Sequence, residues 1–243
     1  LRKRLEMVLN SDDVVMLAEL VYECEERQQD LPDGTLELVQ KIKARLFSLI
    51  SRPGFHVSFA GGVPGLKDER AAELEIALNR RNQKQLEVWQ HEQETNRKDG
   101  DVDSAALLLC SSMRHVLSLE TEIAHAVDRG DSAAVTAAVT KCHAADVSPE
   151  NSAVVRGMEA LEVMRLIDVG TSQLEQQFDE KAIRSLLDEI SVVLPIDKQM
   201  ADPQSAELSS LDKLHLSLAG VAKKLRASIR THDLLRSLQR ASK

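Results

Sequence analysis

The sequence has few aromatic residues, few cysteines and no long apolar run. Aromatic side chains make up 2% of the 243 residues, which argues against nucleic-acid stacking platforms and sugar-binding sites. No run of 18 apolar residues occurs, so no segment is typical of a membrane-spanning helix. The three cysteines form no CxxC pair. An odd number of unpaired cysteines indicates a reducing compartment, and we expect a cytoplasmic protein.

Proline and glycine are also scarce, with 6 and 10 residues respectively. Hydrophobic residues make up 43% of the chain, enough to bury a sizeable core, and Leu, Ala and Val supply most of it. No stretch has the alternation of a β-ladder. The composition therefore predicts an all-α protein.

A pattern of apolar residues recurs along the chain with a period near 50 residues. The first apolar position of each copy is Leu5, Leu74, Ile123 or Leu174, with a weaker, partial copy at Leu225. The second and third apolar positions, four and twelve residues later, are Leu9, Leu78, Val127 and Phe178, and Leu17, Leu86, Val135 and Leu186. Such a period predicts an array of stacked supersecondary units, with equivalent positions buried alike.

Each copy also carries signals for a turn between two helices. Eight residues after the first apolar position stand Asp13, Asn82, Asp131 and Asp233, which suit helix N-caps, with Ala182 as the exception. Gly130 suits a left-handed helix stop just before one of them. A unit is thus a long helix, a tight turn, a shorter helix and a looser loop. Long helices are predicted from Thr35, Ser104, Ser152 and Gln204, after polar loops at 28–35, 96–103, 145–151 and 194–203.

The first spacing is about 20 residues longer than the others, and we assign the excess to an inserted loop at residues 51–69. Phe55, Val57 and Phe59 alternate in it, which predicts an extended segment docked at least in part. Phe55 and Phe59 have two interpretations: contact with their own array, or contact with a partner. Trp89, the only tryptophan, is likewise either a core residue or a partner anchor.

The charge is unevenly distributed. The chain has a net charge of −8, yet residues 219–243 hold seven basic residues against one acidic residue. The basic residues proposed as partner contacts are Lys223, Lys224, Arg226 and Arg230. They fit either an acidic partner surface or a solvated helix face that complements the chain's own acidic body.

No motif indicates catalysis, a metal or a cofactor. His91 opens an HExxH-like stretch, but Thr95 replaces the second zinc ligand. The glycine-rich residues 61–68 lack the Lys-Ser/Thr ending of a phosphate-binding loop. Cys24 and Cys142 occupy one repeat position, which indicates packing rather than zinc binding. We therefore expect no enzyme activity, no metal and no cofactor.

The unit of long helix, Gly-Asp turn and short helix resembles the helical hairpins of tetratricopeptide- and armadillo-type arrays, although the 34-residue tetratricopeptide signature is absent. The resemblance implies an α-solenoid of about four helical hairpins over residues 1–243, part of a longer protein, with a closed helical bundle as the alternative. It implies a non-enzymatic scaffold or adaptor that binds proteins, of a cytoskeletal, ciliary or trafficking kind. The alternatives are a rod or spacer in a cytoskeletal assembly and an accessory segment of an enzyme whose catalytic domain lies outside this chain.

Overall fold

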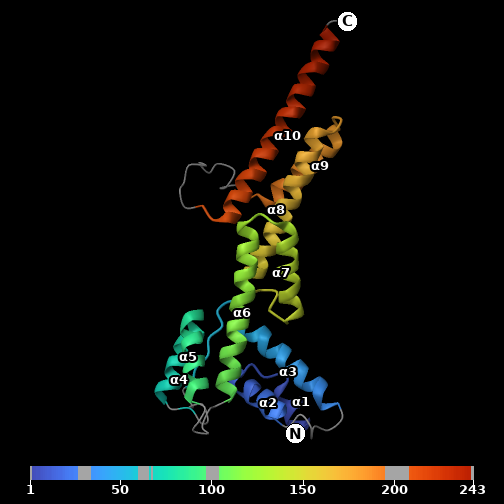
Figure 1. Ribbon diagram of the computed structural model, residues 1–243. Coiled ribbons are helices and arrows are strands. Elements are labelled where there is room, and N and C mark those ends of the chain that lie inside the picture. Colours follow the sequence, from blue (N-terminus) through green and yellow to red (C-terminus); the bar gives the residue numbers. More distant parts are fainter. Residues whose placement is uncertain are drawn as a thin grey trace. The chain divides into compact units, whose positions relative to one another are not determined.

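The computed structural model describes residues 2–26, 34–59, 66, 68–96, 104–194 and 208–241 (Figure 1). Every regular element in these ranges is an α-helix, so the all-α prediction is confirmed for them. The ten helices are α1 (Arg2–Val8), α2 (Val14–Glu26), α3 (Thr35–Ile50), α4 (Asp68–Asn79), α5 (Gln83–Asn96), α6 (Ser104–Asp128), α7 (Ser132–Ala144), α8 (Ser152–Glu175), α9 (Glu180–Val193) and α10 (Ser210–Ala241). The helices fall into two compact units, Leu1–Glu122 with Ala138–Val155 and Ile123–Ala137 with Arg156–Lys243.

The long helices begin where the sequence predicts them. Helices α3, α6 and α8 start at Thr35, Ser104 and Ser152. The Asn151 side chain caps α8, because its Oδ1 accepts the backbone N–H of Ala153 at 3.0 Å. The predicted start at Gln204 and most residues of three predicted loops (27–33, 97–103 and 195–207) lie outside the described residues.

The second and third copies of the repeat share one turn geometry. Arg81 and Gly130 both have positive φ, of 50° and 64°. The next N–H groups, of Asn82 and Asp131, reach back to carbonyl oxygens five residues earlier at 3.0 and 3.2 Å, which completes a Schellman motif. Asp13, Asn82 and Asp131 then cap the following helices through their side-chain oxygens. The predicted caps in the first three copies are confirmed.

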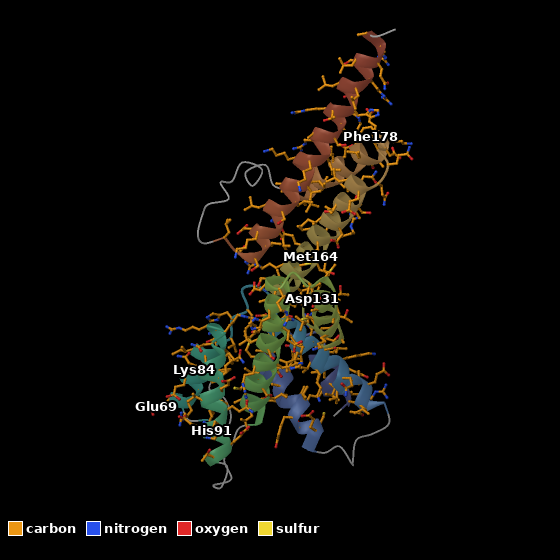
Figure 2. All side chains as sticks on the ribbon, turned by 45° about the horizontal axis from the view of Figure 1, so that its top comes forward. Glu69, Lys84, His91, Asp131, Met164 and Phe178 are labelled. Carbon is orange, nitrogen blue, oxygen red and sulfur yellow. The ribbon has the colours of Figure 1, made fainter. Side chains whose placement is uncertain are left out.

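The last two copies differ from the prediction. Helix α9 is capped by Asp179, whose carboxylate accepts the N–H groups of Lys181 and Ala182, so Ala182 lies inside the helix. The predicted cap at Asp233 is wrong, because α10 runs unbroken from Ser210 to Ala241. At the place of Gly130 this copy has His232, whose ring stacks on that of Phe178 with centroids 4.0 Å apart. Figure 2 labels Phe178. No glycine stops the helix there.

Burial follows the repeat at two of its three apolar positions. The third position is buried in all four full copies (Leu17, Leu86, Val135 and Leu186), and the first in three of them. At the second position only Leu78 is buried, and Leu9, Val127 and Phe178 are half-buried, so equal burial is wrong there. The core instead uses the residue one place earlier, Val8, Ala77 or Ala126. Both the three-residue and the four-residue spacing place a side chain on the inner face of a helix, and in these copies the residue at the three-residue spacing is buried.

A buried polar network joins segments of the first unit that lie far apart in the sequence. The Asn151 amide donates to the Ser51 carbonyl oxygen at 2.8 Å and to the Glu120 carboxylate at 2.6 Å. The Ser51 hydroxyl accepts the Ser148 N–H at 2.7 Å, and Arg81 forms an ion pair with Glu120. The network therefore ties the end of α3 to α6 and to the start of α8.

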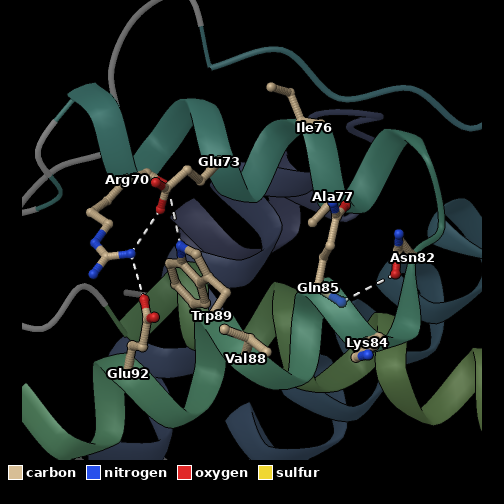
Figure 3. A pocket seen from close by; sticks show the side chains of 10 residues that line it. All are labelled: Arg70, Glu73, Ile76, Ala77, Asn82, Lys84, Gln85, Val88, Trp89 and Glu92. Atoms are coloured by element: carbon tan, nitrogen blue, oxygen red, sulfur yellow. Dashed lines mark hydrogen bonds and ion pairs between the residues drawn. The ribbon is translucent and has the colours of Figure 1, made fainter.

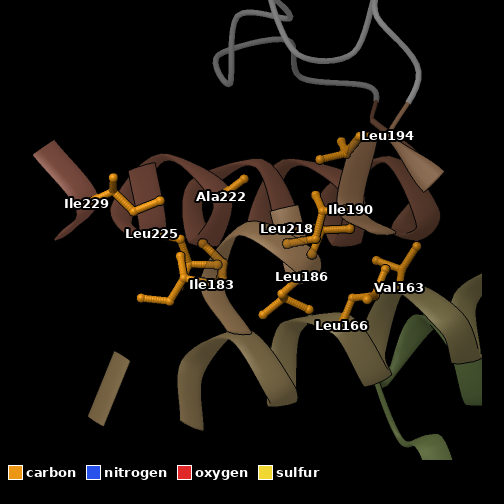
Figure 4. Packing of buried hydrophobic residues seen from close by; sticks show 11 residues of the cluster. Val163, Leu166, Ile183, Leu186, Ile190, Leu194, Leu218, Ala222, Leu225 and Ile229 are labelled. Carbon is orange, nitrogen blue, oxygen red and sulfur yellow. The ribbon is translucent and has the colours of Figure 1, made fainter. Parts of the chain in front are cut away.

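In the second unit, one apolar cluster joins α8, α9 and α10 (Figure 4). Its buried members are Val163, Leu166, Ile183, Leu186, Ile190, Leu194, Leu218, Val221, Ala222, Leu225 and Ile229. Helix α8 approaches α10 closely at Gly170, where an added Cβ would lie 2.5 Å from Cγ1 of Val221. Gly170 thus sets the spacing of two helices.

Candidate protein-binding surfaces

The segment that contains the inserted phenylalanines docks on α4. The Asn79 side chain accepts the Val57 N–H at 2.8 Å and donates to the Val57 carbonyl at 2.8 Å, as a neighbouring strand would. The Phe59 N–H donates to the Glu75 carboxylate at 2.6 Å. Val57 and Phe59 are buried, whereas Phe55 is half-buried. The burial of Phe59 agrees with contact to its own chain; residues 60–65 and 67 of the inserted loop lie outside the described residues.

Trp89 is also buried, in the helical hairpin of α4 and α5. Its side chain is 3% exposed, and its Nε1 donates to the Arg70 carbonyl at 3.2 Å. It belongs to the wall of a groove of about 600 Å³ between the two helices (Figure 3). The groove is lined by Arg70, Glu73, Ile76, Ala77, Asn82, Lys84, Gln85, Val88, Trp89 and Glu92.

The groove has an apolar middle and charged ends. Ile76 and Val88 are 48% and 52% exposed, so two aliphatic side chains border it without being buried by the hairpin. At one end Arg70 pairs with Glu73 at 2.8 Å and with Glu92 at 2.6 Å, and these carboxylates raise the pKa of the guanidinium. Lys84 lies at the other end, near the turn (Figure 3). One end thus has two carboxylates for one cation, and the other end has a cation.

Sequence reasoning missed this groove. Arg70 and Glu92 lie 22 residues apart, on different helices, so no local pattern joins them. The signal that could have found it is an aliphatic residue at the outward-facing position of each helix, Ile76 and Val88, beside the only tryptophan.

The outer face of α10 forms a second surface. The predicted contacts Lys223, Lys224, Arg226 and Arg230 are all exposed, and none forms an ion pair within the described residues. Towards the helix end, three leucines are exposed by 64%, 53% and 65%: Leu234, Leu235 and Leu238. Their spacing places them on one side of the helix. We call these seven residues the α10 surface.

The groups that could support chemistry are dispersed or buried. Cys24, Cys110 and Cys142 are free thiols in the core. Among the described residues no three His, Cys, Asp or Glu side chains gather as metal ligands would. The helices in the same part of the chain include none that is long and apolar enough to cross a membrane.

The structure therefore brings two of the predicted site residues into the core, Phe59 and Trp89, and leaves the four basic residues of α10 accessible. Function must be argued from these surfaces and their chemistry. No family model, curated protein or solved structure matches this chain.

Proposed function

We propose that the chain is a non-enzymatic protein-binding module, a scaffold or adaptor, built from helical hairpins stacked as an α-solenoid. The shared turn of the second and third repeat copies supports hairpins of one kind in succession. A closed helical bundle is the alternative arrangement. The observation that carries the function is the α10 surface.

The α10 surface has the chemistry of a protein contact. Helix α10 packs one face against the core, yet it also exposes three neighbouring leucines. Clusters of exposed apolar side chains mark interaction sites. The cations lie on the preceding turns of the same helix. An amphipathic acidic helix complements both halves, because its apolar side covers the leucines and its carboxylates meet the lysines and arginines.

The test measures binding of a labelled helical peptide, with leucines on one side flanked by glutamates, to the whole chain by fluorescence anisotropy. Two double variants, L234S/L238S and K223E/R230E, remove the apolar and the cationic half. We expect each to weaken binding by more than tenfold, since each removes central contacts worth about 2 kcal/mol or more.

The controls change other exposed residues elsewhere in the same unit. V192S alters a valine of α9 that is 86% exposed, and R156E reverses an exposed arginine of α8. Both should bind the peptide like the unchanged chain. Equal weakening by the controls, or no peptide binding at low salt, contradicts the proposal. Binding to phosphatidylserine vesicles through the same residues, without peptide binding, would assign the surface to a membrane instead.

A further inference from the structure

We propose that the groove between α4 and α5 is a separate binding site, whose ligand is a short amphipathic helix with two neighbouring aliphatic anchor residues. The bound helix lies with its N-terminus at the Glu73 and Glu92 end and its C-terminus at Lys84. This site shares no residue with the α10 surface, so it can be tested independently of the function proposed above.

The anchors follow from the apolar middle of the groove. Ile76 of α4 and Val88 of α5 are each about half exposed and line the groove together with Ala77 and Trp89. Figure 3 shows Val88 beside Trp89 on α5. A volume of about 600 Å³ lies within the 300–1,000 Å³ range of ligand pockets. Two aliphatic side chains of a ligand, one turn apart, would cover both exposed residues at once.

The backbone of the groove selects a helix over an extended peptide. Both walls are α-helices, whose interior N–H and C=O groups already bond within the helix. An extended peptide would find few partners for its own backbone groups there. A helical ligand satisfies its backbone internally and needs only side-chain contacts.

The charges of the groove select the direction of the ligand. At one end the carboxylates of Glu73 and Glu92 outnumber the guanidinium of Arg70. At the other end the ammonium of Lys84 has no ion-pair partner within the described residues. The positive N-terminus of a helix macrodipole is favoured near the carboxylates, and the negative C-terminus near the lysine.

The chain carries its own reporter for this site. Trp89 is its only tryptophan and lines the groove, so tryptophan emission reports on the surroundings of this site. The probe is a stapled helical peptide without tryptophan, with leucines at i, i+3 and i+4, lysine near its N-terminus and glutamate near its C-terminus. A second peptide has the two end charges exchanged.

We expect saturable titration of Trp89 emission by the first peptide, with about fivefold weaker binding of the exchanged peptide. I76S and V88S should each weaken binding at least tenfold, whereas V192S, which alters a more exposed valine of α9, should not. K84E should abolish or reverse the preference between the two peptides. Circular dichroism checks that each variant keeps its helices.

Three outcomes would overturn the proposal. They are unchanged Trp89 emission up to millimolar peptide, binding that V88S leaves intact, and equal binding of an unstapled peptide made non-helical by proline. Because L234S/L238S leaves this groove intact, a chain that loses α10 binding but keeps the emission change separates the two sites. A V88S chain that loses the emission change but keeps peptide binding at α10 would also separate the two sites.

Discussion

The buried thiols give a prediction at the level of single residues. Burial raises the pKa of Cys110 to about 12 and that of Cys142 to about 11. Because the thiolate is the nucleophile, both should react slowly with Ellman's reagent at pH 8 in the native chain, and all three cysteines should react promptly in denaturant. Rapid reaction of native Cys110 or Cys142 would contradict the structure.

The same pKa shifts determine how the free energy of unfolding changes with pH in the alkaline range. Below the ordinary thiol pKa of 9.0, native and unfolded chains hold the same thiol protons. Between pH 9 and the raised native values of about 12 and 11, the unfolded chain releases protons that the native chain retains. The thiols therefore lower the free energy of unfolding as pH rises through this window, and C110A should reduce that slope.

The polar network around Asn151 gives a second prediction for a single residue. N151A removes the cap of α8 and leaves the Ser51 carbonyl without its amide donor, inside the core. We expect a loss of about 2–4 kcal/mol in the free energy of unfolding by urea, combining a lost cap with an unsatisfied buried group. D179A removes an exposed cap of α9 only, and should cost about 1 kcal/mol. Equal losses in the two variants would mean that the network contributes nothing.

At the scale of helices, two glycines in the same unit should respond oppositely to alanine. In G170A the new Cβ would lie 2.5 Å from Cγ1 of Val221, a stiff β-branched side chain, so α8 and α10 must move apart. Overpacking of this kind costs about 1–3 kcal/mol. In G220A the new Cβ meets nothing within 4 Å, and the chain should gain about 0.5–1 kcal/mol from helix propensity. Urea unfolding measures both, and a stabilised G170A would refute the close approach.

The helices also show what local sequence signals determine. Thr35, Ser104 and Ser152 could be predicted as helix starts because caps and loop residues act within a few positions. The continuation of α10 past Asp233 could not be predicted from the local sequence, because an aspartate caps a helix only where the preceding residues form a turn. There His232 instead stacks on Phe178, 54 residues earlier, a contact that no local pattern contains.

The candidate site likewise combines features that the local sequence predicts with features that depend on tertiary packing. Exposure of Lys223 and Arg230 could be predicted, since a run of cations can rarely be buried. The burial of Trp89 was one of two open interpretations, and its groove depends on the pairing of α4 with α5. The ion pair of Arg70 with Glu73 is a local i,i+3 pair within α4, whereas the ion pair of Arg70 with Glu92 joins α4 to α5 and follows from tertiary packing.

For the whole molecule, the solenoid proposal makes a prediction that separates it from the closed bundle. A compact globule of 243 residues has a radius of gyration of about 18 Å. Helix α10 alone has 32 residues and is about 48 Å long, close to the full diameter of such a globule. In a solenoid each hairpin contacts only the hairpins next to it in the sequence. Such an arrangement would not enclose α10 in a spherical globule.

We therefore expect small-angle X-ray scattering of the monomer to give a radius of gyration clearly above 18 Å, with a distance distribution that tails to long distances. A concentration series is needed, since association through the exposed leucines of α10 would raise the radius for a different reason. L234S/L238S provides the control, because it removes that association and leaves the buried cluster of α8, α9 and α10 unchanged. A symmetric distribution with a radius near 18 Å in this variant would favour the closed bundle, and the repeat would then describe hairpins that fold back on one another.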